Sequence, residues 1–80
     1  MVDKPIDVRG AQGPFAAPVS FRWQNRWHAV QAVLDVWPDT GSWWDGEEES
    51  LFFRITAAGG KLFELVRDRS GRWRLYRIYD

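Results

Sequence analysis

The sequence predicts an all-β domain, an antiparallel meander of about five strands that curls into a small barrel or roll. Short aromatic and β-branched runs alternate with turn signals, which are Gln-Asn at 24–25, Ala-Gly-Gly at 58–60 and Arg-Ser-Gly at 69–71. Several of these runs are apolar on both faces, so a flat sheet would leave one apolar face in water. Curling covers that second face, as would a tryptophan-containing loop or a second subunit.

The chain has 80 residues, no cysteine and six tryptophans. A chain of this length forms one domain with a small core, and without disulfides its stability must come from aromatic packing, with self-association as a further source. Residues 1–17 are rich in proline and glycine, which predicts a flexible arm or, from the alternation around Ile6 and Val8, a short edge strand. We expect residues 18–80 to form the single β domain.

Residues 18–30 predict the first hairpin, because Gln-Asn separates two aromatic runs and Asn tolerates a left-handed backbone. This turn places Phe21 opposite His28 and Arg22 opposite Trp27. The side chains expected on the core-like face are Val19, Phe21, His28 and Val30, and those on the other face are Ser20, Arg22, Trp27 and Ala29. We expect Arg22 and Trp27 to form a cation–π pair on that other face.

The second strand is expected to run from Arg26 towards Trp37 and to end at a turn over 37–42 that contains proline and glycine. A helix is the alternative, because the apolar residues of this stretch also recur at helical spacing. The valines of the stretch are β-branched and no N-cap residue precedes it, which favours the strand. A helical turn or a bulge within 27–37 stays open.

Two further hairpins follow along the chain. Residues 51–57 and 61–68 predict one around the Ala-Gly-Gly turn, and the turn at 69–71 joins 61–68 to a C-terminal strand. The expected cross-strand pairs are Phe53 with Leu65, Arg54 with Glu64, Ile55 with Phe63, Leu65 with Leu75, Arg67 with Trp73 and Asp68 with Arg72. We expect the arginine and glutamate of this set to form an ion pair.

The formal net charge is zero, which argues against a protein that coats DNA by charge alone. Acidic residues concentrate in 35–49 and arginines in 67–77. No apolar run approaches the roughly 20 residues of a membrane-spanning helix, and the first residues lack the pattern of a signal peptide. We therefore expect a cytoplasmic protein that has no membrane partner.

Neither catalysis nor metal binding is indicated by the residues. His28 is the one histidine, and no serine or carboxylate is tied to it by spacing, so we expect it to be a structural histidine at the core or rim. The acidic residues within 45–49 do not match the spaced ligands and central glycine of a calcium loop and predict a solvated loop. We expect no enzyme activity, no metal and no cofactor.

Several motifs carry a resemblance to a known family. They are, in order, F-R-W-x-x-R-W-H-x-V, then W-W before an acidic stretch, F-F-R-I, K-L-F-E-L-x-R-D and W-R-L-Y-R-I-Y-D. The stretch from Pro18 to Asp80 resembles a family of small bacterial domains of unknown function. That family is similar to the C-terminal segment of ImuB-type proteins, the catalytically inactive Y-family polymerase homologues of the translesion mutasome. The resemblance implies a link to DNA damage tolerance.

Two hypotheses of function follow, and the first is a protein-interaction module. Such a module would dock through a free sheet edge or an exposed tryptophan, for which the candidates are Trp27, Trp43 and Trp44. In the setting that the resemblance implies, its partner is a repair or replication protein.

The alternative hypothesis is single-stranded nucleic-acid binding, with single-stranded DNA as the partner. Arginines that hold phosphates beside aromatic rings that stack bases are the parts of such a site. The candidate residues are Arg22, Trp27, Arg54, Arg72, Arg74 and Tyr76. The opposing interpretation is that the aromatic residues complete a second core layer while the arginines pair with carboxylates.

Overall fold

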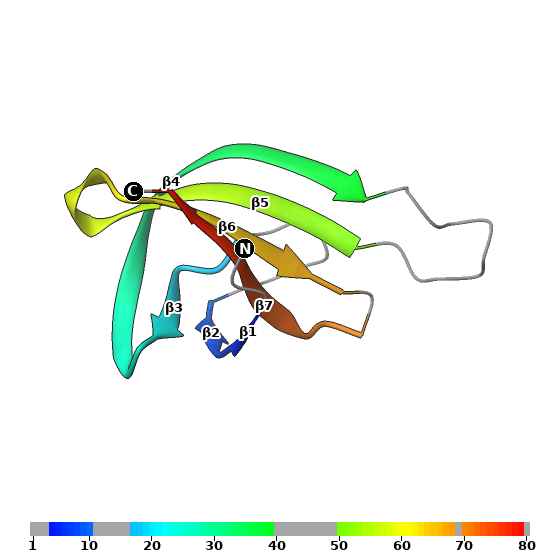
Figure 1. Cartoon of the computed structure of the whole chain (residues 1–80), viewed down its shortest axis with the longest axis horizontal. Helices are drawn as coiled ribbons and strands as arrows, with labels where there is room; N and C mark the ends of the chain where they lie inside the picture. Colours follow the sequence, from blue (N-terminus) through cyan, green and yellow to red (C-terminus); the bar gives the residue numbers. More distant parts are fainter. Residues whose placement is uncertain (1–3, 11–16, 40–49, 69, 80) are drawn as a thin grey trace.

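The computed structural model describes residues 4–10, 17–39, 50–68 and 70–79, which form one antiparallel sheet (Figure 1). The strands lie in the order β1-β7-β6-β5-β4-β3-β2. Their bounds are β1 Lys4–Ile6, β2 Val8–Arg9, β3 Ser20–Trp23, β4 Arg26–Asp39, β5 Ser50–Ala57, β6 Leu62–Arg67 and β7 Trp73–Tyr79, with a 3-10 turn η2 over Ala58–Gly60. The predicted fold class is confirmed: strands β3 to β7 are an antiparallel meander that curls into a nearly closed barrel.

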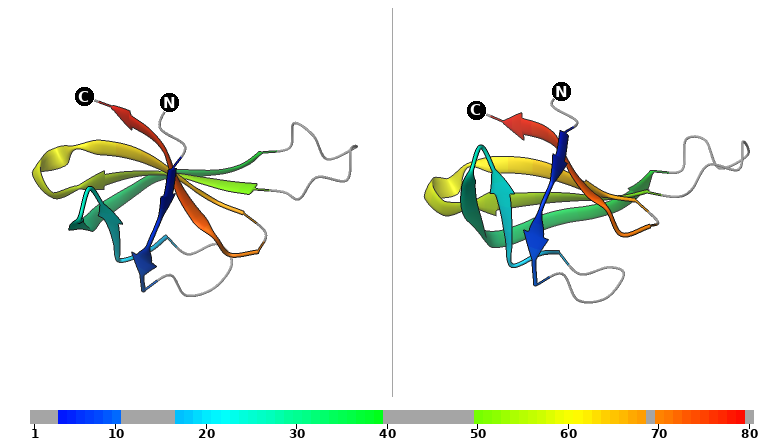
Figure 2. Two further views of the ribbon diagram at one scale, coloured as in Figure 1. Left: turned by 60° about the horizontal axis from the view of Figure 1, so that its bottom comes forward. Right: turned by 90° about the horizontal axis from the view of Figure 1, so that it is seen from below.

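The N-terminal strands β1 and β2 close this barrel. β1 pairs with β7, where Lys4 lies opposite Leu75, and β2 pairs with β3, where Val8 lies opposite Phe21. Figure 2 shows these blue strands between the cyan strand β3 and the orange-to-red strand β7. One short stretch of chain therefore supplies a partner strand to both ends of the meander. The sequence had predicted only a flexible arm or a short edge strand for this N-terminal stretch.

The first hairpin has the predicted register. Phe21 lies opposite His28, and the turn residues Gln24 and Asn25 have φ values of 52° and 63°. Phe21 is fully buried, and its ring stacks on that of His28 with 5.3 Å between the centroids. The prediction for Val19 is wrong, because its side chain is 66% exposed and lies against Gly10 at the end of the barrel instead of in the core.

Strand β4 is extended throughout, so the helical alternative is wrong and the bulge alternative is confirmed. The register against β5 shifts between Val30 and Ala32 and again between Val33 and Asp35. Each shift inserts one residue and reverses which side chains face inward, and the apolar residues therefore recur at three- and four-residue intervals that imitate a helix. The strand also continues through the first part of the predicted turn at 37–42, up to Asp39.

The other two hairpins pair as predicted, including Arg54 with Glu64 and Leu65 with Leu75. A bulge that the sequence did not predict falls at Tyr76, because Glu64 lies opposite Arg77. The inward side chains of all these strands form the core, whose buried members are Phe21, Phe53, Ile55, Ala57, Phe63, Leu65, Trp73 and Leu75. The core therefore joins the first hairpin to the later meander.

Substitution of Gly10 tests the closure of the barrel. Gly10 has φ +76°, and a Cβ atom there would lie 2.9 Å from Cβ of Val19 and 2.5 Å from its Cγ2. Gly59 is a matched control, with φ +85° and no atom within 4 Å of the added Cβ. We expect Gly59→Ala to lower the free energy of unfolding by about 1–2 kcal/mol, and Gly10→Ala by about 1 kcal/mol more, in chemical denaturation. Equal losses would mean that the N-terminal stretch does not pack against Val19.

The turn between β6 and β7 gives a pH-dependent prediction. The hydroxyl of Ser70 donates a hydrogen bond to Oδ1 of Asp68, and this bond, with a further one from the backbone N–H of Arg72, lowers the pKa of Asp68 below 3.8. A lowered pKa stabilises the fold above the unfolded-state value, and that contribution is lost as the pH falls through the folded-state pKa. In an NMR titration of the carboxyl carbon, we expect Ser70→Ala to raise the pKa of Asp68 towards 3.8. Ser20→Ala, on β3, should leave it unchanged, and a pKa that does not respond to Ser70→Ala would contradict this assignment.

Candidate interaction surfaces

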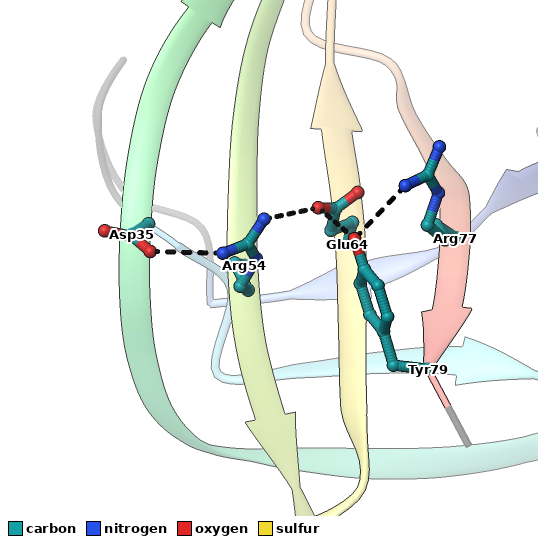
Figure 3. Close-up of polar contacts among 5 residues, drawn as sticks. All are labelled: Asp35, Arg54, Glu64, Arg77 and Tyr79. Atoms are coloured by element: carbon teal, nitrogen blue, oxygen red, sulfur yellow. Dashed lines mark hydrogen bonds and ion pairs between the residues drawn. The ribbon is translucent and has the colours of Figure 1, made fainter.

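A polar network crosses the outer face of the sheet from β4 to β7 and is centred on Glu64 (Figure 3). The Glu64 side chain is only 4% exposed, and its Oε1 accepts hydrogen bonds from Nη2 of Arg54 at 3.0 Å and from the hydroxyl of Tyr79 at 2.8 Å. Nη1 of Arg54 lies 3.5 Å from a carboxylate oxygen of Asp35, and Nη1 of Arg77 donates to the Tyr79 hydroxyl at 3.3 Å. The network therefore ties four neighbouring strands together, and the predicted ion pair between Arg54 and Glu64 is confirmed.

The hydrogen bonds of this network also raise the pKa values of its arginines. The bond to Glu64 is the largest cause that raises the pKa of Arg54, and the bond to Tyr79 raises the pKa of Arg77. Arginine side chains are cations in proteins in any case, and these bonds favour that charged form further. Arg54 is held by two carboxylates, which leaves it poorly suited to bind a phosphate.

An aromatic layer lies beside the network on the same outer face. The ring of Phe52 stacks on Trp37 with 5.6 Å between the centroids and meets Tyr76 edge-on at 5.0 Å. Val66, which lies opposite Phe52, is 1% exposed although it faces away from the barrel interior. Tyr76 is thus a member of a second packed layer, as the opposing interpretation of the sequence expected.

The structure divides the six predicted nucleic-acid residues between two regions. Arg22 and Trp27 face outward on the first hairpin, whereas Arg54, Arg74 and Tyr76 lie on β5 and β7. The sixth residue, Arg72, is exposed at the turn before β7, where its backbone N–H donates to Asp68. In Figure 1 the first hairpin is turned away from β5, β6 and β7 by the bend in β4.

Trp27 is 39% exposed, and an arginine covers one face of its ring. The predicted partner Arg22 lies opposite it in the ladder, but the guanidinium over the indole is that of Arg9, 3.9 Å from the ring centroid. Arg22 instead directs Nη2 towards Oδ1 of Asn25, at 3.4 Å. The predicted cation–π pair is therefore corrected to Arg9 and Trp27, because β2 brings Arg9 alongside β3, a pairing that no local turn signal predicts.

Two predicted candidates, Trp43 and Trp44, lie outside the described residues, as does the acidic stretch 45–49.

His28 packs against Phe21 and Phe63, and its Nε2 lies 3.4 Å from the carbonyl oxygen of Trp23. In the described part of the chain, no group of three or more His, Cys, Asp or Glu residues is placed to hold a metal ion. Those same residues form no helix long and apolar enough to cross a membrane.

The open edge of β4 is a surface that the sequence did not locate. Past Val30, no strand from the described ranges pairs with the side of β4 opposite β5, and Figure 1 shows this part of β4 at the rim of the sheet. Three aliphatic side chains on it are exposed: Val33 by 45%, Leu34 by 52% and Val36 by 44%. We call these three residues and the backbone of 31–38 the β4 edge. Val33 and Val36 lie opposite the buried residues Ile55 and Phe53, so they share the inner face of the sheet, and they are exposed because no strand from the described ranges lies beyond β4 there.

Fold and surfaces together define a small β-barrel domain with a salt-bridged outer face and an open sheet edge along β4. The chain belongs to the DUF6504 family, a domain of unknown function, whose family model matches residues 1–80. No curated protein and no solved structure matches the chain. The predicted membership of a family of small domains of unknown function is confirmed and includes the N-terminal residues, whereas the likeness to ImuB-type proteins has no support in these comparisons and stays a prediction.

The polar network predicts that removal of Arg54 and removal of Glu64 lower the stability of the fold by unequal amounts. Arg54→Met leaves the buried carboxylate of Glu64 without its cation, whereas Glu64→Gln keeps an acceptor oxygen and releases Arg54, whose side chain is 37% exposed, to water. We expect Glu64→Gln to lower the free energy of unfolding by about 1 kcal/mol and Arg54→Met to lower it more. Asp35→Asn is the control. We expect it to change the free energy of unfolding by no more than about 0.5 kcal/mol, because the Asp35 side chain is 61% exposed. Urea denaturation gives the order, and a smaller loss for Arg54→Met than for Glu64→Gln would contradict it.

Proposed function

We propose that this domain is a non-catalytic protein-interaction module that binds an extended segment of a partner along the β4 edge. The observation that carries the proposal is the exposure of Val33, Leu34 and Val36 on an unpaired stretch of strand. An added strand would receive main-chain hydrogen bonds from β4, and the aliphatic side chains would give its side chains an apolar surface to bury.

The composition of the β4 edge supports this use. Exposed edges in soluble proteins are commonly protected by lysines, yet the sequence has no lysine or arginine from Trp27 to Asp39. The protection that remains is the two bulges and Pro38, which lacks an N–H and lies at the far end of the strand. Asp35, which is 61% exposed, gives the edge a negative charge, so a partner segment that combines apolar and basic residues is the best complement.

The biological setting of the proposal comes from the sequence resemblance alone. A module similar to the C-terminal segment of ImuB-type proteins would work in the bacterial cytoplasm and contribute to DNA damage tolerance or translesion repair. Its partner would then be a repair or replication protein.

Introduction of positive charge on the β4 edge tests the interaction. We expect Val33→Lys combined with Val36→Lys to reduce capture of partner proteins by the intact domain about tenfold, measured by affinity purification with quantitative mass spectrometry. Val19→Lys is the matched control, because Val19 is also an exposed valine, by 66%, but is not on β4. Circular dichroism melting checks that the three proteins are equally folded.

Equal capture by the double variant and the wild type would contradict the proposal. Self-association that the double variant abolishes would also overturn it, because the occupant of the β4 edge would then be a second copy of the chain. Sedimentation of the purified proteins separates that outcome from binding of a different partner.

A second candidate function is binding of single-stranded nucleic acid at the outer face of the first hairpin. It is favoured by the exposed ring of Trp27 with Arg9 over one face and Arg22 beside it. We expect labelled oligothymidylate to bind at low salt, to weaken steeply as salt rises, and to lose affinity in an Arg9→Gln, Trp27→Ala variant. Arg72→Gln, at the β6–β7 turn, is the control, and an absence of binding at low salt would remove this candidate.

A further inference from the structure

A groove of about 540 Å³ opens where the N-terminal stretch crosses from β7 to β3. It lies between β1 and the tip of the first hairpin, where these two segments are neighbours without being paired strands. Its volume falls within the range of about 300–1,000 Å³ that is usual for sites that bind small molecules. The groove is therefore a product of the way in which the barrel closes.

The lining of the groove combines an apolar floor with charged walls. Ile6 and Trp23 line it while they also pack against the core, which fixes the indole in place. Lys4 and Arg22 bring two cations to the groove, and Asp7 brings one carboxylate. Two cations beside an aromatic ring are the groups that recognise a phosphate attached to a base.

Arg22 is held in position at this groove. Its backbone N–H donates to the carbonyl oxygen of Asp7 at 2.8 Å, which ties β3 to the N-terminal stretch. Its guanidinium Nη2 lies 3.4 Å from Oδ1 of Asn25, which also lines the groove. The side chain of Arg22 is exposed, so its other donors can reach a ligand.

We propose that this groove binds a nucleoside 5′-phosphate unit, either a free nucleotide or one nucleotide of a single strand. The phosphate lies between Lys4 and Arg22, the base lies against the indole of Trp23, and the carboxylate of Asp7 accepts a hydrogen bond from the base or sugar. The proposal deepens the second candidate function, because the groove adjoins the outer face of the first hairpin through Arg22. It does not depend on the β4 edge.

The test is an NMR titration of the ¹⁵N-labelled intact chain with deoxythymidine 5′-monophosphate. We expect saturable shifts of the Trp23 indole N–H and the Asn25 side-chain amide. The double variant Lys4→Gln, Arg22→Gln should raise the Kd about tenfold or more, because two charge-assisted contacts are lost. Arg26→Gln is the matched control, since Arg26 lies opposite Trp23 in the hairpin but does not line the groove, and its Kd should stay within about twofold.

The other arms of the experiment use thymidine, inorganic phosphate and oligothymidylate. Inorganic phosphate that binds as tightly as the nucleotide, or thymidine that does so, would overturn the proposal, because one half of the ligand would then contribute nothing. If oligothymidylate shifts the same signals at a lower concentration than the mononucleotide does, the natural ligand is one nucleotide of a single strand. If the two bind with equal affinity, the natural ligand is the free nucleotide. Shifts at the Trp27 indole without shifts at Trp23 would leave the outer-face candidate standing and refute the groove.

Discussion

The pairing of one N-terminal stretch with both ends of the meander is the constraint on which the other features depend. β1 pairs with residues 73–75 of β7, and β2 pairs with residues 20–21 of β3, so one stretch of chain covers part of two strand edges. Because the stretch is short and must reach two strands, it leaves the groove beside Trp23 where it crosses between them. The distal part of β4 also has no paired neighbour among the described strands, and its exposed aliphatic side chains make it a suitable place for another chain to add a strand.

Arginines on the outer face of the sheet make structural contacts within the domain. Arg54 is held by Glu64 and Asp35, and Arg77 by Tyr79, so two of the cations on this face are engaged with their neighbours. Phe52, packed between Trp37 and Tyr76, completes a second layer over Val66. The exposed indole of Trp27 has a cation over one face, because the guanidinium of Arg9 lies 3.9 Å from its ring centroid.

Local signals in the sequence were enough to predict the three hairpins, because a tight turn fixes the pairs on either side of it. Phe21 with His28, Arg54 with Glu64 and Leu65 with Leu75 all follow from turn positions. Pairing across long separations, such as Lys4 with Leu75, has no turn to reveal it, and bulges such as the one at Tyr76 respond to the curvature of the whole barrel. The candidate sites depended on these non-local features, so Trp27 was predicted as a candidate but its partner Arg9, the β4 edge and the groove were not.

The closure of the barrel also constrains the order in which the chain can fold during synthesis. Among the described strands β1 is synthesised before the others and its partner β7 after them, so the hairpins can form one by one while the barrel stays open. Until β7 emerges, the nascent chain presents unpaired strand edges and an uncovered core that includes Phe21 and Phe63.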